Sequence, residues 1–205
     1  MDTRRLLFII IGISSLVMLV TFTLTPKPET PVLIGDHLDR ATRNMPYQSQ
    51  TVNNTPIIFD DYLITPLAEF QIKARVLSRE NYWLGREADL SPVDFALGWG
   101  RMANPDITDN ITISQRNRWY YWKTDKYPIP RAEIENSSAN MHMIPANEVI
   151  ADKLKQVKEG DHVSITGKLV RIDAEDGWRW VSSLSRADTG DGACEVVYVT
   201  SIRTP

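Results

Sequence analysis

The side chains that could act as nucleophile, base and orienting acid are few and far apart in this chain. Cys194 is the single cysteine, and His142 lies between two methionines. With either Asp94 or Asp188 they can in principle converge as a triad, because the members of a triad are distant in sequence in other enzymes too. A thiol needs a neighbour such as histidine that lowers its pKa. An envelope hydrolase using Cys194 and His142 is therefore kept as the alternative hypothesis.

Asp188-Thr189-Gly190 is the tripeptide that carries the activating carboxylate in aspartic proteases. Those enzymes pair two such aspartates, and the chain holds one copy, preceded by Ser185-Arg186-Ala187 rather than by an apolar strand. Asp and Gly are also the residues that tight turns require. We therefore interpret this segment as a turn.

The sequence predicts no metal site and no cofactor. It has three histidines, His37, His142 and His162, and none is three or four positions from another. A nucleophile elbow and a phosphate-binding loop are also lacking. These absences favour a binding protein over an enzyme.

A stretch of basic and aromatic residues that begins at Arg116 is the strongest candidate for ligand binding. In a strand, Trp119 would point away from Arg116, Arg118 and Tyr120, so one face can belong to the core while the other carries solvated arginines. Rings and guanidinium groups also suit stacking against a partner. The candidate ligand-binding residues are Trp99, Arg116, Arg118, Trp119, Tyr120, His142, Arg186 and Asp188.

The expected cellular location of the chain limits the kind of partner that it can bind. Residues 6–24 carry no charge, and their length of roughly 28 Å as a helix matches a hydrocarbon core of about 30 Å. This predicts a transmembrane helix that embeds the chain in the lipid bilayer. A cleaved signal peptide is the alternative, but the apolar stretch is longer than usual for one and no small-x-small site follows it.

Arg4 and Arg5 precede the predicted anchor and indicate its direction. Positive residues favour the cytoplasmic side, so we expect residues 1–5 in the cytoplasm and the rest of the chain outside it. The formal net charge of −3 gives no general attraction to nucleic acid. An envelope protein or a glycan is the expected partner.

The predicted organisation beyond the anchor is a spacer and one domain. Residues 25–56 are polar and rich in Pro and Asn, and residues 57–205 form the expected α+β domain, mainly antiparallel, with two short helices. A single cysteine cannot form an intrachain disulfide. A buried Cys194 that behaves as a small apolar residue is thus favoured over a catalytic thiol.

Periodicity predicts the elements of this domain. Apolar residues alternate over residues 68–76, which indicates a half-buried strand. Ser91, Pro92 and Asp94 resemble the start of a helix that ends near Gly98. Residues 111–122 are typical of a second strand. A second helix is expected after Asn147, with Val149, Ile150, Leu154 and Val157 on its buried side and Gly160 as its left-handed stop.

The C-terminal part predicts three more strands. Residues 163–172 alternate but are interrupted by Gly167, which marks a bulge or a sharp bend, and residues 178–184 and 194–202 complete an expected meander. The Gly-Asp-x-Val-x-Ile-x-Gly-x-Leu-Val pattern of residues 160–170 resembles the first strand of an OB-fold barrel. An OB-like or small barrel is the expectation, although this fold alone names no ligand.

Three blocks, residues 89–100, 138–146 and 183–195, are similar to an uncharacterised family of bacterial single-pass membrane-anchored proteins. The resemblance implies the inner membrane as location, with the domain in the periplasm. It implies no activity and no catalytic residues. The resulting hypothesis is a membrane-anchored periplasmic binding or assembly module.

Overall fold

The computed structural model describes residues 45–51, 53–185 and 193–204. Within these ranges no helix is long and apolar enough to cross a bilayer. The predicted anchor, residues 6–24, lies outside the described residues, as do Arg186 and Asp188.

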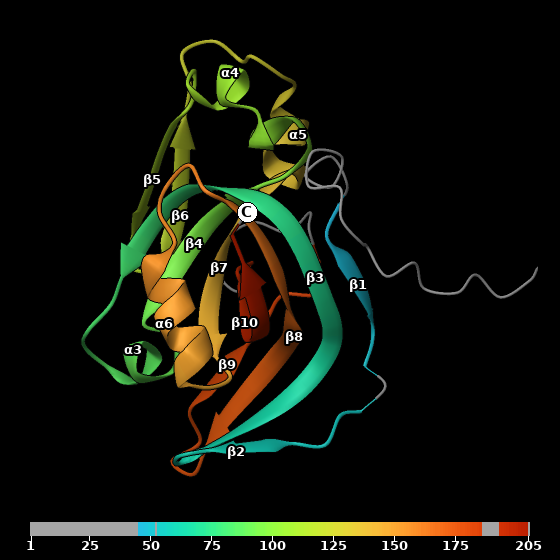
Figure 1. Cartoon of the computed structure of the whole chain (residues 1–205), viewed down its shortest axis with the longest axis vertical. Helices are drawn as coiled ribbons and strands as arrows, with labels where there is room; N and C mark the ends of the chain where they lie inside the picture. The colour runs from blue at the N-terminus through green and yellow to red at the C-terminus, as the bar shows by residue number, and fades with distance from the viewer. Residues whose placement is uncertain (1–44, 52, 186–192, 205) are drawn as a thin grey trace, which may run out of the picture. The chain divides into compact units, whose positions relative to one another are not determined.

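Five strands pair in a closed ring, in the order β3, β4, β7, β10, β8 and back to β3. They are β3 (Tyr62–Asn81), β4 (Val93–Gly98), β7 (Ser138–Pro145), β8 (His162–Ala174) and β10 (Glu195–Arg203). β7 and β10 run parallel, and the other pairs in the ring are antiparallel. Figure 1 shows the long β3 curving alongside β8. The domain is thus mainly β, with mixed rather than purely antiparallel pairing.

Apolar side chains fill the interior of the ring. Alternate residues of each strand point inward, so that Phe95 of β4, Met143 of β7 and Val197 of β10 belong to one buried cluster. Helix α6 (Glu148–Gln156) adds Ile150 and Leu154 to the same cluster. The predicted strand over residues 68–76 is confirmed as the central part of β3.

The predicted Asn147 cap of α6 is also confirmed, because Asn147 Oδ1 accepts a hydrogen bond from Ile150 N. Val149, however, is 64% exposed, so its predicted place on the buried side was wrong. Gly160 has the expected left-handed φ of 91°, but the helix ends earlier, at Gln156. Gly160 instead shapes the turn into β8.

The helix predicted from Ser91 to Gly98 was wrong, because Val93–Gly98 is strand β4. All six of its residues are buried, and it pairs with β3 on one edge and β7 on the other. These pairings outweigh the local capping signal. The helix of this region, α3 (Arg86–Leu90), precedes the strand.

An excursion of the chain between β4 and β7 lies on the outer face of the ring. It contains η1 (Gly100–Ala103), α4 (Pro105–Thr108), β5 (Thr112–Arg116), β6 (Trp119–Lys123) and α5 (Arg131–Asn136). The single strand predicted over residues 111–122 is thus a hairpin, and more helices are present than the two expected. The apolar face of this excursion packs over Ala96 of β4. It thereby buries part of the outer side of the barrel.

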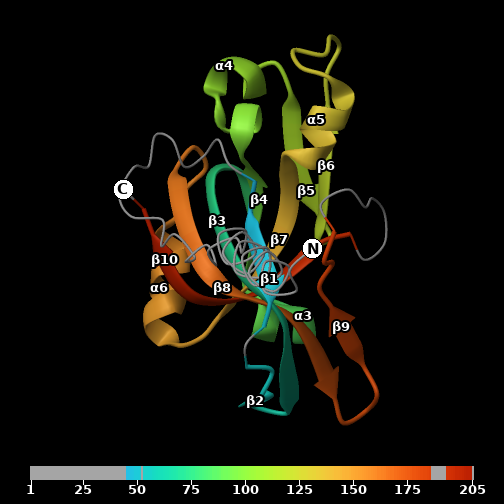
Figure 2. The ribbon, with the colours of Figure 1, turned by 90° about the vertical axis from the view of Figure 1, so that its right-hand side faces the viewer.

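Three short strands complete the sheet: β1 (Tyr47–Gln50), β2 (Ile57–Phe59) and β9 (Arg179–Val181). β1 pairs with β3, so part of the predicted spacer over residues 25–56 belongs to the domain. The expected meander was wrong, because β9 and β10 both pair with β8 rather than with each other. Figure 2 shows β9 beside the lower end of β8, while β10 follows its upper part.

Candidate functional site

A polar cluster lies on the outer face of β4 and β7, where a solvated or apolar surface would be the ordinary expectation. Asp94 and His142 are direct register partners on these two strands. Their neighbours Phe95 and Met143 point into the barrel, so Asp94 and His142 point out of it. Both are nevertheless buried, Asp94 completely, because the β5–β6 hairpin and β9 cover them.

The Asp94 carboxylate is held by four side chains, which together with it we call the Asp94 cluster. Its Oδ1 lies 2.7 Å from Arg118 Nη1 and accepts a long hydrogen bond from Ser91 Oγ at 3.4 Å. Its Oδ2 lies 2.8 Å from His142 Nδ1 and 3.4 Å from Asn140 Nδ2. A buried carboxylate requires such compensation, since an unpaired charge is costly away from water.

The His142 imidazole is fixed more by packing than by hydrogen bonding. Its Nδ1 is at ion-pair distance from Asp94, yet the ring does not point the Nδ1 hydrogen along the line of a good hydrogen bond. The ring packs at 4.7 Å, centroid to centroid, against Trp180 of β9. The imidazole is therefore close to an anion and has an aromatic wall on one side.

Arg118 is held on three sides. Nη1 donates to Asp94 Oδ1 and, at 2.9 Å, to the backbone oxygen of Ser91. The guanidinium carbon lies 3.7 Å from the centroid of the Tyr82 ring and 5.6 Å from that of Trp180. Tyr82 also accepts a hydrogen bond from the Arg118 backbone nitrogen.

Arg118 adopts an unusual backbone conformation. Asn117 and Arg118 form the two-residue turn of the hairpin, and both have positive φ, 54° and 68°. Such a turn favours Asn followed by Gly, because a long side chain at positive φ is strained. Strain of this kind persists where surrounding contacts impose it, as the contacts of the Arg118 side chain do here.

Cys194 lies next to this cluster. Its Sγ is 3.8 Å from the Arg118 backbone oxygen and 3.9 Å from Asn140 Nδ2. Asn140 also accepts a hydrogen bond from Gln115 of the hairpin. The thiol is thus on the same face as His142, with Asn140 between Cys194 and Asp94.

The other predicted site residues are distributed over the fold. Trp99 is only 2% exposed and belongs to the barrel interior, away from the Asp94 cluster. Arg116 and Trp119 are exposed at the turn end of the hairpin. Tyr120 donates a hydrogen bond to Ser138, and burial raises its pKa to about 12.

Sequence reasoning did not name Tyr82, Trp180 or Asn140 as site residues, and it assigned Ser91 only a role in capping a helix. The Asp in the apolar run Val93-Asp94-Phe95-Ala96-Leu97 was the available signal, since an ionisable residue in a buried strand needs partners. Ser91 is only three residues from Asp94, whereas Tyr82, Asn140 and Trp180 come from separate elements that only the fold brings together.

Three exposed apolar side chains lie next in sequence to residues that pack at the cluster. Trp83, Trp119 and Val181 are 80%, 36% and 42% exposed, and each directly follows a residue that stacks beside the cluster: Tyr82, Arg118 and Trp180. We call these three residues the apolar rim. Exposed apolar patches are typical of interaction sites, and these three residues are the candidates for one near the Asp94 cluster.

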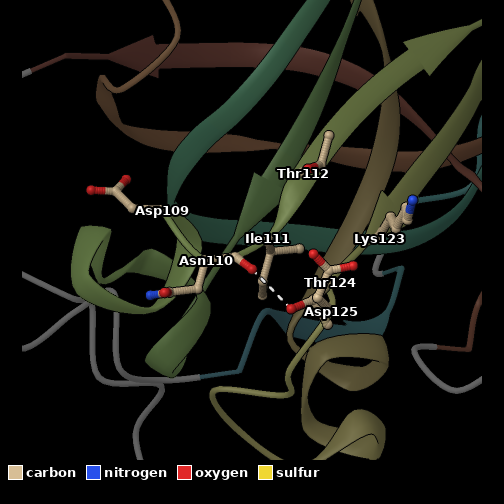
Figure 3. A pocket seen from close by; sticks show the side chains of 7 residues that line it. All are labelled: Asp109, Asn110, Ile111, Thr112, Lys123, Thr124 and Asp125. Carbon is tan, nitrogen blue, oxygen red and sulfur yellow. Dashed lines mark hydrogen bonds between the residues drawn. The ribbon is translucent and has the colours of Figure 1, made fainter.

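Two of the hollows in the described part of the chain lie elsewhere. Figure 3 shows one of about 230 Å³ at the open end of the hairpin, where Thr124 donates a hydrogen bond of 2.9 Å to the Asn110 backbone oxygen. The other, of about 390 Å³, is lined by β6 and α5, and Arg131 lies over the Trp122 ring at 5.8 Å. Neither includes a member of the Asp94 cluster.

Within the described residues, no three His, Cys, Asp or Glu side chains gather as metal ligands. No known family model matches the chain, and no curated protein or solved structure matches it either.

Proposed function

We propose that the chain is a single-pass binding or assembly module of the bacterial inner membrane. Residues 6–24 anchor it in the lipid bilayer, residues 1–5 stay in the cytoplasm, and the domain lies in the periplasm. The charge-free segment behind Arg4 and Arg5 supports this placement. The partner is an envelope protein.

We assign the barrel to the OB type. The five-stranded ring supports this assignment, with α6 between the third and fourth barrel strands, β7 and β8. In OB folds, ligands bind the face of the second and third strands and the loops beside it. These strands are β4 and β7 here, and the loops that follow β3 and β8 supply Tyr82 and Trp180.

One observation carries the binding proposal: each residue of the apolar rim directly follows a residue that packs at the Asp94 cluster, namely Tyr82, Arg118 or Trp180. The Asp94 cluster and the rings of Tyr82 and Trp180 that pack on it hold the hairpin, β9 and the β3–β4 loop together, and the apolar rim has one residue on each of these three elements. Protein interfaces are enriched in Trp, Tyr and Arg at their centres. A pre-organised surface of this composition fits a protein partner better than a nucleic acid.

Site-specific photo-crosslinking in cells tests the proposal. The full-length chain carries a photoreactive residue at position 83, 119 or 181 in turn, and position 149 on α6 is the matched control because Val149 is also exposed, at 64%. We expect one discrete protein adduct from the three rim positions and none from position 149. Equal labelling at all four positions, or none at the rim, would rule out the proposed interface.

An envelope hydrolase using Cys194 and His142 is the second candidate. The pairing of His142 with Asp94, with Cys194 on the same face, is the observation that favours it. A catalytic thiol would react with iodoacetamide much faster than a small-molecule thiol at neutral pH, and His142→Gln would slow it. An unreactive Cys194, with normal cross-linking by Cys194→Ser, would exclude this candidate.

A further inference from the structure

The guanidinium of Arg118 has used only part of its hydrogen-bonding capacity. Arginine carries five N–H donors. Both donors of Nη1 are engaged, one with Asp94 and one with the Ser91 backbone oxygen. Nε and Nη2 donate to no acceptor in the part of the chain that the structure describes, and neither is fully buried.

These remaining donors form one side of the planar guanidinium. Nε–H and one Nη2–H point in parallel, which is the geometry that binds both oxygens of a carboxylate. The N–H bonds lie in the plane of the guanidinium, so hydrogen bonds form around its edge, and Tyr82 covers one face of the plane at 3.7 Å. The Arg118 side chain is 18% exposed, and this limited access is consistent with the approach of one small acceptor group.

The same contacts hold the fork in place before any ligand arrives. Asp94 and Ser91 fix Nη1, and the hydrogen bond from the Arg118 backbone to Tyr82 fixes the turn. Asp94 also offsets the charge of Arg118, so selectivity rests on paired hydrogen bonds more than on net charge. A guanidinium ordered in advance loses little conformational entropy on binding.

We propose that Arg118 is a carboxylate-binding subsite at the centre of the partner surface. Its remaining N–H groups donate hydrogen bonds to a C-terminal or side-chain carboxylate of the partner protein. This inference rests on the proposed function and names the group that the surface recognises. The apolar rim supplies contacts for the apolar part of the residue that carries the carboxylate. Trp83 and Trp119 are the nearest large exposed side chains in sequence to the stacked pair Tyr82 and Arg118.

A matched pair of small ligands tests the subsite on the full-length protein in detergent micelles. N-acetylphenylalanine carries the carboxylate, and N-acetylphenylalaninamide replaces it with a neutral amide. We expect the acid to bind about tenfold more tightly than the amide, since charge-assisted bidentate hydrogen bonds are the stronger class. Isothermal titration and tryptophan fluorescence measure both affinities.

Two substitutions and a control locate the effect. Arg118→Lys keeps a positive charge near Asp94 but lacks the planar fork, and Arg118→Gln removes the charge; both should abolish the preference for the acid. Arg116→Gln changes an exposed arginine of the same hairpin and should preserve it. A thermal unfolding curve for each variant shows whether it is folded. If a variant fails to fold, the comparison of acid and amide on the unaltered protein still tests the subsite.

Equal affinity for acid and amide, no binding of either, or an acid preference that survives in Arg118→Gln would overturn the subsite. These results differ from failure of the proposed function. If cross-links form at the rim while the acid preference is absent, only the carboxylate subsite is wrong. If cross-links are absent from the rim, the partner surface itself is wrong.

Discussion

His142 Nδ1 lies 2.8 Å from Asp94 Oδ2, across the register pair that joins β4 to β7. The opposite oxygen of Asp94 pairs with Arg118, so one buried carboxylate connects two barrel strands to the hairpin that covers them. Any change at Asp94 should therefore affect both stability and the position of Arg118.

Asp94→Asn should destabilise the fold strongly. Asp94 is fully buried and the Arg118 side chain is mostly buried, so the substitution leaves a cation without its anion. Removing one partner of a buried ion pair costs about 3 kcal/mol or more, and the remaining exposure of Arg118 brings our expectation to about 2 kcal/mol. Urea unfolding followed by tryptophan fluorescence measures the change in the free energy of unfolding.

Asp176→Asn is the control for this prediction. It breaks the Arg86–Asp176 ion pair, whose side chains are 36% and 55% exposed, and exposed pairs contribute less than about 1 kcal/mol. If Asp94→Asn costs no more than Asp176→Asn, the Asp94 cluster does not stabilise the barrel.

The elements that could be predicted from the sequence are those whose signals are local. The alternation over residues 68–76 and the Asn147 cap depend on neighbours within a few residues, and both appear in the structure. The segment from Ser91 to Gly98 shows the limit of such signals. Its capping residues indicate a helix, yet pairing with β3 and β7 decides its conformation.

The candidate site could be predicted only in part from the sequence, for the same reason. Asp94 lies 24 residues from Arg118 and 46 from Asn140 in sequence, so no short motif connects them. The hairpin turn was missed because Asn117-Arg118 lacks the glycine that usually reveals it. His142, Arg118 and Asp94 could each be named from residue type alone, but the pairing of Asp94 with both of the others could be found only with the fold.

Gly167→Ala should disrupt closure of the barrel. A Cβ at Gly167 would lie 2.2 Å from the Tyr198 backbone oxygen, where β10 pairs with β8 beside an irregularity in register. Because the contact is with backbone, the strands must separate, and we expect a loss of about 3 kcal/mol or failure to fold. Thermal unfolding measures the effect.

Gly177→Ala is the matched control for Gly167→Ala. Gly177 has a φ of 85°, but a Cβ there would meet nothing within 4 Å. The cost should be limited to backbone strain, about 1 to 2 kcal/mol. A smaller loss for Gly167→Ala than for Gly177→Ala would contradict the close approach of β8 and β10.

Asn117 offers a test of the hairpin turn that leaves the Arg118 side chain in place. Its φ is 54°, so Asn117→Ala should destabilise the protein by about 1 kcal/mol, whereas Asn117→Gly should be nearly neutral. Both effects are read from chemical unfolding. If Ala is tolerated as well as Gly, the turn does not require left-handed backbone, and the strain assigned to Arg118 is incorrect as well.

Two tyrosines should make the fold sensitive to alkali. Burial raises the pKa of Tyr82 and of Tyr120 to about 12, from an ordinary value near 10. The folded state therefore holds these protons more tightly than the unfolded state, so their contribution is complete below pH 10 and is lost as the pH rises toward about 12. Absorbance near 295 nm during alkaline titration should show ionisation of both rings together with unfolding, and Tyr120→Phe should remove part of the late step. Ionisation of every tyrosine near pH 10 with the fold intact would contradict the burial of these two rings.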